Sequence, residues 1–294
     1  MRKKNNRNKT QAIENARIFD AYYNWLKNIA LSEFEWVNLP DSMDERFLEL
    51  ALYQNGRALI CEDKKYKTGI INLRATTSGA MNIYENYTRY KGYSIGYEQN
   101  YDADECVYVR NNRTATPTDL FIYMWAERLA KIEIGIQSNV AIQRFPIIAK
   151  TTDAQRMSME NMLEKFEGGI PFIISDKSFD NFNEISVFNN PIPMIAGDLF
   201  ELKRKTFNDC LTFLGINNAN NEKANRMIVD EVNANNENIG ISCATFYEQR
   251  RLACEQANEM YGLNICVKKR DVSDLLTLIR GDSADGNGKD TDVE

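Results

Sequence analysis

One long helix constrains the fold of this chain more than any other feature of its sequence. Thr116 is a suitable N-cap, Pro117 fits the first helical position, and the helical pattern continues to Arg144, just before Pro146. At 1.5 Å per residue this helix would be roughly 42 Å long, which exceeds the diameter of an ordinary small domain. Such a helix is either buried within one chain or packed between identical subunits.

The apolar residues of this helix cover a wider face than a surface helix needs. A second helix is expected from Gly197 to Leu214, after an insert over residues 146–193 that contains the strand-like segments PIIAK, IPFIIS and EISVF and the helical segment MSMENMLEKFEGG. We therefore expect an antiparallel pair of helices with a small α/β module at its tip. The apolar stripe of the first helix consists of Phe121, Trp125, Leu129, Ile132, Ile136 and Val140, widened by Leu120, Met124, Ile134 and Ile142.

The rest of the chain predicts helices and short strands in separate regions. The β-prone runs ALICE, TGIINL, GYSIGY and ECVYV lie between Gly56 and Val109, and Gly, Asn and Asp residues separate them. The sequence NICVKK predicts one more strand near residue 266. This pattern indicates an α+β fold. Further helices are expected at residues 12–31, 44–53, 245–261 and 271–279.

An asparagine-rich segment follows the second helix. Residues 212–240 contain nine asparagines, and Lys223 and Arg226 are outnumbered by four acidic residues, so their net charge is −2. A long loop inside a compact domain is usually functional or disordered. This loop is too polar to be core and not basic enough to bind phosphates tightly. It suits a surface that touches a polyanion without holding it.

Composition excludes several classes of protein. The net charge of −6 argues against a nucleic-acid binder with a basic surface, and the absence of histidine excludes nucleophile schemes that rely on imidazole. The six cysteines have no CxxC spacing, so we expect reduced, mostly buried thiols in a protein assembled in a cytosol. No stretch approaches eighteen apolar residues and no signal peptide is visible, so no membrane contact is expected.

Asp102 and Asp104, together with Glu105, could suggest a metal-binding cluster of carboxylates. Asp102 and Asp104 could belong to a metal-dependent enzyme acting on nucleic acid, but aspartates are also common in turns, and the turn is the preferred interpretation. Neither GxxxxGK[ST] nor GxGxxG occurs, so nucleotide binding has no support. We expect no catalytic residues, no metal and no cofactor.

Basic residues gather at two places. Residues 1–10 hold five positive charges and no acid, and this arm is either a disordered solubilising tail or a nucleic-acid contact. Lys203, Arg204 and Lys205 form a basic run in the second helix, either as solvated charges or as a patch that faces phosphates. The positive residues of the arm are Arg2, Lys3, Lys4, Arg7 and Lys9.

Four segments resemble a known protein family. FEWVNLP at 34–40, TFLGINNANNEK at 212–223, RMIVDEV at 226–232 and CEQANEMYGLNICVK at 254–268 resemble the upper collar protein of small short-tailed phages with protein-primed linear genomes. This protein is their portal, or head–tail connector. The resemblance runs from about residue 12 to 268 in the same order. The acidic residues after Gly281 have no clear counterpart in it.

The resemblance implies a ring-forming, mainly helical portal fold with long stem helices. It implies a non-catalytic ring, twelve-fold in the family, at one capsid vertex. The implied parts are a disordered arm (1–10), a mixed α/β wing (11–115 and 241–281), stem helices (116–145 and 194–215), an α/β clip (146–193), a channel loop (216–240) and a disordered acidic tail (282–294).

The resemblance also implies partners. Double-stranded DNA would pass through the channel, with Lys223 and Arg226 as its main contacts and Lys203 and Lys205 as weaker ones. The arm would meet the packaging RNA and its ATPase, and the ring would meet the major capsid, scaffold and lower collar proteins. The protein would reside in the virion, and in the host cytoplasm during assembly. The alternative is another ring-shaped or tail-associated virion protein, which, unlike a portal, would be absent from DNA-free heads.

Overall fold

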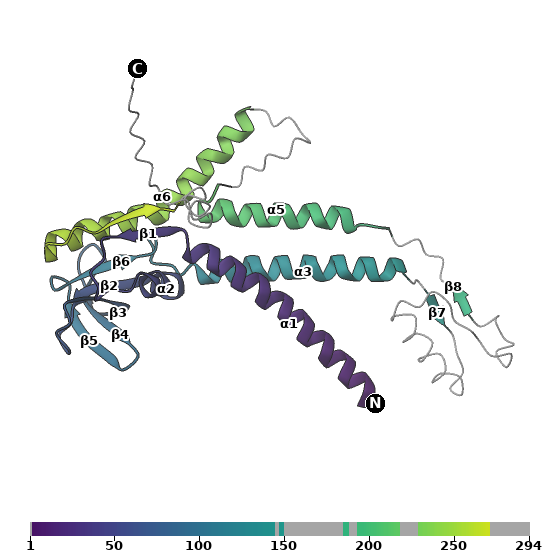
Figure 1. Cartoon of the computed structure of the whole chain (residues 1–294), viewed down its shortest axis with the longest axis horizontal. Coiled ribbons are helices and arrows are strands. Elements are labelled where there is room, and N and C mark those ends of the chain that lie inside the picture. The colour runs from purple at the N-terminus through teal and green to yellow at the C-terminus, as the bar shows by residue number, and fades with distance from the viewer. Residues whose placement is uncertain (1, 145–146, 150–184, 188–192, 218–228, 271–294) are drawn as a thin grey trace, which may run out of the picture. The chain divides into compact units, whose positions relative to one another are not determined.

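The computed structural model describes residues 2–144, 147–149, 185–187, 193–217 and 229–270 (Figure 1). These residues form helices and antiparallel strands, so the α+β fold class is confirmed. The chain divides into two compact units. The larger comprises residues 1–130 and 205–294, and the smaller comprises residues 131–204. None of the described helices contains an apolar segment that could cross a membrane.

Helix α1 (Arg2–Leu31) begins ten residues earlier than the sequence predicts. The arm that we expected to be disordered forms the first turns of this helix. Residues 2–10 contain neither glycine nor proline, and Lys and Arg are good helix formers. Each residue added to an existing helix gains a hydrogen bond without a new nucleation cost. The packed end of α1, where Leu26 is buried, supplies that nucleus.

A five-stranded antiparallel sheet forms the centre of the larger unit, with strand order β5-β4-β3-β2-β6. The run GYSIGY, expected as one strand, is divided by a turn in which Ile95 is fully exposed and Gly96 has a φ of 72°. Its two ends pair with each other, Ser94 opposite Tyr97. The strands are β2 (Arg57–Glu62), β3 (Ile70–Met81), β4 (Tyr87–Ser94), β5 (Tyr97–Asp102) and β6 (Cys106–Arg110).

Both faces of this sheet are buried at strand β2. Along β2, Ala58 and Ile60 belong to a core shared with α2 (Glu45–Asn55) and α6 (Val229–Tyr261), whereas Leu59 and Cys61 belong to a second, tyrosine-rich core. This alternation follows from the two-residue period of a strand. An antiparallel ribbon of β1 (Phe34–Val37) and β9 (Cys266–Lys269) completes the first core, and β9 confirms the strand predicted from NICVKK.

Helix α6 begins much earlier than expected. The sequence predicts a loop to residue 240 and a helix from 245, but α6 starts at Val229 and continues through Gly240. Glycine inside a helix costs only about 1 kcal/mol, which a long, well-packed helix tolerates. Residues 218–228, with Lys223 and Arg226, lie outside the described residues. So do the helices predicted at 157–169 and 271–279 and the strand IPFIIS.

Helices α3 (Asp119–Arg144) and α5 (Ala196–Leu214) confirm the two long helices. The first starts two residues later than predicted, because the Asn111 and Asn112 amides both donate to the Thr116 carbonyl. Thr118 takes the N-cap position, and its carbonyl accepts from the Phe121 and Ile122 amides.

A third core joins α1, α2, α3 and α5 within the larger unit. On α3 the fully buried residues are Ile122, Ala126 and Leu129, whereas Phe121 and Trp125 of the predicted stripe are only half-buried. At the start of α3 the buried face is therefore turned by one residue from the predicted stripe, whereas Leu129 and Ile136 of that stripe are buried as predicted. The remaining buried members are Leu26, Tyr53, Cys210 and Leu214.

The smaller unit contains the far part of α3, the first part of α5, and an antiparallel pair of short strands, β7 (Ile147–Ala149) and β8 (Ile185–Val187). These strands confirm the predictions from PIIAK and EISVF. The buried Asn139 side chain donates to the Pro193 carbonyl and accepts from the Ile195 amide, and so fixes the start of α5 against α3.

Candidate functional site

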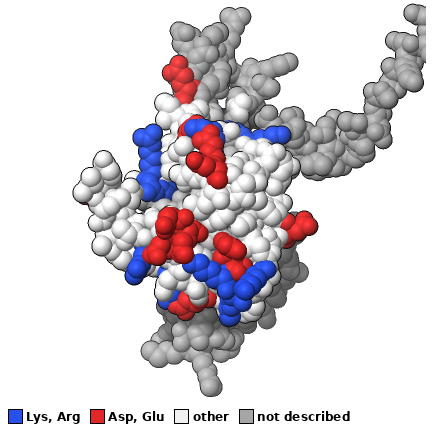
Figure 2. All heavy atoms as spheres, turned by 90° about the vertical axis from the view of Figure 1, so that its left-hand side faces the viewer, with Lys and Arg blue, Asp and Glu red and all other residues white. Residues whose placement is uncertain are grey.

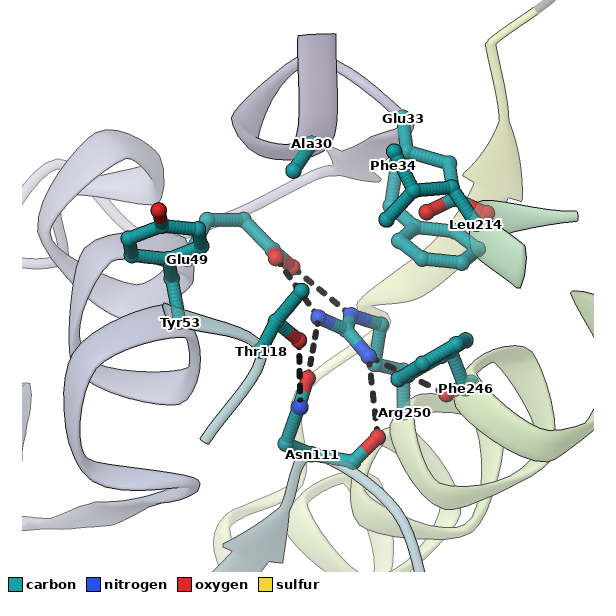
Figure 3. A pocket seen from close by; sticks show the side chains of 10 residues that line it. All are labelled: Ala30, Glu33, Phe34, Glu49, Tyr53, Asn111, Thr118, Leu214, Phe246 and Arg250. Carbon is teal, nitrogen blue, oxygen red and sulfur yellow. Dashed lines mark hydrogen bonds and ion pairs between the residues drawn. The ribbon is translucent and has the colours of Figure 1, made fainter. Parts of the chain in front are cut away.

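A buried arginine organises the base of the long helices in the larger unit. Arg250 of α6 is 3% exposed, and all five of its N–H groups donate hydrogen bonds (Figure 3). Nε and Nη2 donate to the two carboxylate oxygens of Glu49 at 2.8 and 2.7 Å. The other acceptors are the Asn111 carbonyl and side-chain oxygens and the Phe246 carbonyl. We call Arg250, Glu49, Asn111, Thr118 and Glu33 the Arg250 cluster.

The Arg250 cluster connects four elements. Glu49 lies on α2, Arg250 on α6, and Asn111 directly after β6, while the Asn111 amide donates to the Thr118 hydroxyl at the start of α3. The first turn of α3 is thereby fixed to the sheet and to both packing helices. Loss of one partner from a buried ion pair leaves an uncompensated charge and typically costs 3–5 kcal/mol, on the order of a whole domain's stability.

The electrostatics of the cluster follow from its burial. Burial by itself lowers the pKa of Arg250, but the Glu49 carboxylate outweighs this effect and raises the pKa above its usual value. The guanidinium also lies 4.4 Å from the centroid of the Phe34 ring. Arg250 is therefore permanently charged, and its guanidinium is fixed by Glu49, by Asn111 and by the Phe34 ring.

Glu33 is the exceptional member of the cluster. It is 6% exposed, and among the described residues no group donates a hydrogen bond to its Oε1. Burial raises the pKa of Glu33 to about 8, although Arg250 and Lys269 act in the opposite direction. The cavity that it lines has a volume of about 10 Å³. That volume admits about one water molecule and no substrate, so the cluster is a structural centre and not a reaction site.

The basic run on α5 divides into residues with different surroundings. Lys203 donates to Glu133 of α3 at 3.0 Å, and both side chains are about three-quarters buried. Its ammonium group also lies 4.3 Å from the Phe200 ring centroid. Lys205 is exposed and forms no ion pair with any residue that the structure describes. The structure thus separates the two lysines that the sequence groups together.

The other predicted site residues fall into two groups. Lys223 and Arg226 lie outside the described part of the chain, whereas the backbone of the basic arm belongs to α1. Asp102 accepts from Arg89 at 2.8 Å, and no group of acidic or cysteine side chains within the described ranges could hold a metal ion. Burial raises the pKa of the Cys61 and Cys210 thiols to about 11 and 12, so neither is an effective nucleophile.

Surface charge on the larger unit is mixed. Figure 2 shows Lys and Arg side by side with Asp and Glu on the face that it presents, with no large patch of one sign. Described ion pairs account for part of this mixture, among them Lys64–Glu105 and Arg89–Asp102. A face of this kind does not attract a polyanion strongly.

The Arg250 cluster could have been found from the sequence but was missed. Arg250 lies between Phe246 and Ala253 on the apolar face of its helix, and Glu49 lies between Leu48 and Ala51. A charged residue at a core position of each of two helices indicates a buried pair. The partner assignment still required the fold, because 201 positions separate the two residues.

Comparisons with known proteins give one family model and several solved structures. The model of a family described as Phage Connector (GP10) matches residues 3–273. A solved structure described as "Portal and tail of native bacteriophage P68" is similar over 97% of this chain and 98% of that chain, with 17% identity and a TM-score of 0.50. A structure described as "Virion of native gene transfer agent (GTA) particle" covers 92% of this chain and 87% of that chain, at 12% identity and a TM-score of 0.41.

Proposed function

Because this chain belongs to the phage connector (GP10) family, we propose that its copies close into a ring around a DNA channel at one vertex of the capsid. The chain is a structural portal protein of the virion. The observation that carries the proposal is the match of family and portal fold over almost the whole chain. A twelve-fold ring is the expected assembly.

Exposed apolar residues support packing between copies. In the larger unit, Leu120 and Tyr123 of α3 are 64% and 54% exposed. In the smaller unit, Phe200 and Leu202 of α5 are 55% and 47% exposed. Long helices that present apolar residues on both their inner and outer faces suit a ring in which each helix contacts its own chain and a neighbour. These helices would form the stem, residues 146–193 the clip, and the remaining α/β structure the wing.

The channel would interact weakly with DNA. The chain carries a net charge of −6, which repels phosphates, while a ring repeats each basic residue in every subunit. Lys223 and Arg226 are the proposed DNA contacts, with Lys205 as a weaker one. Lys203 is the weakest candidate, because Glu133 already neutralises its charge. Few phosphate contacts allow DNA to slide.

The partners follow from the place of a portal between head and tail. We propose that the capsid and scaffold proteins surround the ring, and that a lower collar protein extends it toward the tail. The basic residues at the start of α1 would meet the packaging RNA and ATPase. Assembly would take place in the host cytoplasm, and the protein itself would perform no catalysis.

Electron microscopy of the purified full-length protein tests this proposal directly. Class averages should show a ring with a central hole, and the mass in solution should be an integral multiple of the chain's 33.9 kDa. A stable monomer at micromolar concentration would contradict the assembly. Substitution of Phe200 and Leu202 by serine should weaken the ring, whereas the same change at the exposed loop residue Ile95 should leave it intact.

A further inference from the structure

A second cavity in the larger unit has the chemistry of an anion-binding site. It has a volume of about 260 Å³ and lies among β4, β6 and α6. We call it the Arg110 pocket. Its lining residues are Asn86, Tyr90, Ala103, Cys106, Tyr108, Arg110, Gln249, Leu252, Ala253 and Gln256.

Arg110 carries a charge that no described carboxylate balances. Its Nη2 donates to the Asn86 side-chain oxygen at 2.8 Å, and its guanidinium lies 5.5 Å from the Tyr108 ring centroid. Arg57 lies directly opposite Arg110 on the neighbouring strand, and its Nε donates a hydrogen bond to the Asn55 carbonyl. Among the described residues, neither arginine forms an ion pair. Like charges directly opposite each other destabilise a sheet, so the arrangement favours a bound anion.

The rest of the lining adds hydrogen-bond donors and no acid. Burial raises the pKa of both Tyr90 and Tyr108, so both phenols stay protonated. Their rings stack at 4.5 Å and form one rigid wall. Gln249 and Gln256 supply amide groups from α6. The Asn86, Gln249 and Gln256 amides, both phenols and the Arg110 guanidinium are all hydrogen-bond donors.

No acidic side chain lines the pocket. Several acidic residues close to it in sequence are already paired. On α6, Arg251 binds both Glu248 and Glu255. Before β6, Lys64 binds Glu105 and Arg89 binds Asp102. We therefore look for the anion elsewhere in the chain.

We propose that the Arg110 pocket binds the acidic segment 282–294 of the same copy of this chain. This segment has five acidic residues and one lysine, a net charge of −4. It lies beyond residues 3–273, which the family model matches. The eleven residues between Arg270 and Asp282 span up to about 40 Å when extended. The proposal does not depend on ring closure.

The size of the pocket fits an acidic peptide. A volume of about 260 Å³ lies just below the range of small-molecule sites, and it accommodates one or two acidic side chains with adjacent backbone. Leu252, which is 40% exposed, and Ala253 supply an apolar wall for the aliphatic part of those side chains. A carboxylate that reaches Arg110 would gain charge-assisted hydrogen bonds.

Photo-crosslinking in the full-length protein tests the proposal. Leu252 is replaced by p-benzoylphenylalanine, and the crosslinked peptides are identified by mass spectrometry after irradiation. The crosslinked partner should be a peptide from residues 282–294. Amide replacement of the five acids should lower the yield about tenfold, as should Arg110→Gln, whereas Arg110→Lys should retain part of it.

Matched controls separate the pocket from general charge. Arg89→Gln removes an exposed arginine from the same sheet and should leave the yield unchanged. Crosslinks to another segment, or an undiminished yield in the amide variant, would overturn the proposal. So would a crosslink to copurified nucleic acid, which would make the pocket a phosphate site. The amide variant leaves the pocket itself intact, so it remains decisive if Arg110→Gln disturbs folding.

Discussion

Single residues in the larger unit decide whether its elements can meet. Arg250 uses every donor that it has, so the two helices and the end of β6 are fixed by one side chain. Glu33 lies beside it with an unsatisfied oxygen and stays neutral at physiological pH. Gly215 ends α5 where the backbone of α6 passes too closely for a side chain. The first two features depend on charge, and the third on shape.

Glu33 should make stability fall as the pH rises. The folded protein keeps the Glu33 proton up to about pH 8, whereas an ordinary glutamate loses it near 4.5. Between these values the folded state binds the additional proton, so the free energy of unfolding declines by about 1.4 kcal/mol per pH unit. Glu33→Gln should abolish this decline, as measured by denaturant unfolding at pH 5, 7 and 9.

The control for this prediction is Glu35→Gln, which changes an exposed glutamate two residues further along the chain, on β1. It should retain the pH dependence of the unchanged protein. Parallel stability curves for Glu33→Gln and the unchanged protein between pH 5 and 9 would show that Glu33 is ionised in the folded state.

Gly215 should tolerate no side chain. Its φ is 76°, and a Cβ atom would lie 2.5 Å from the Cys243 backbone nitrogen. Gly215→Ala combines left-handed strain with a clash against backbone, so we expect a loss of about 2–4 kcal/mol in the free energy of unfolding. Gly262 has a similar φ of 65° and open space around it, so Gly262→Ala should cost only about 1 kcal/mol. Equal losses of unfolding free energy for the two variants would contradict the close approach of the Cys243 backbone to Gly215.

At the scale of elements, the sequence indicates which segments are helices better than it indicates where they end. The apolar period predicts the long helices. The start of α3 depends instead on side-chain hydrogen bonds, because the Asn111 and Asn112 amides both donate to the Thr116 carbonyl. Which face of α3 is buried also depends on the helices packed against it. The small Ala126 is fully buried in the third core, whereas the large Trp125 is only half-buried. The N-terminal half of α6 was missed because asparagines are poor helix formers in isolation.

The contact of α3 with α5 in the smaller unit should depend measurably on Lys203. The Lys203–Glu133 pair is about three-quarters buried, so its coupling should exceed that of a surface pair. A double-mutant cycle with Lys203→Met and Glu133→Gln should give a coupling energy of about 0.5–1.5 kcal/mol in thermal or chemical unfolding. The exposed Arg89–Asp102 pair, 65% and 53% exposed, supplies the comparison and should give less than about 0.5 kcal/mol. A larger coupling for the exposed pair would refute the assignment.

At the scale of the whole molecule, family and fold could be anticipated from four sequence segments, whereas the pairing of the charged residues that hold the fold together could not. Glu49 and Arg250 become neighbours only once α2 and α6 pack on the same face of the sheet. The Arg110 pocket likewise needs β4, β6 and α6 together. Patterns in the amino-acid sequence indicate helical or strand periodicity and local turns. They do not specify which charged residues meet when many positions of the chain separate them.

The assembled particle should respond to the charge of the segment after α5. Neutralisation of Lys223 and Arg226 by glutamine should leave ring formation intact and change the amount of DNA retained after packaging, because each removed charge is repeated around the ring. Retention is measured as the fraction of full heads after centrifugation. The matched control neutralises Arg113 and Lys268, which are exposed on the larger unit. Unchanged retention with normal rings would exclude the two residues as DNA contacts.

Strand β2 of the five-stranded sheet is buried on both faces, and this has a consequence for the resistance of the larger unit to force. Strand β2 is hydrogen-bonded to β3 on one side and β6 on the other, and Ala58, Leu59, Ile60 and Cys61 are fully buried. Amide protons in such a strand exchange with solvent only when the whole unit opens. If pressurised DNA pulls on the helices that begin beside this sheet, β2 should be the last element to yield. Increased deuterium uptake in β2 would then report that the larger unit has unfolded under force.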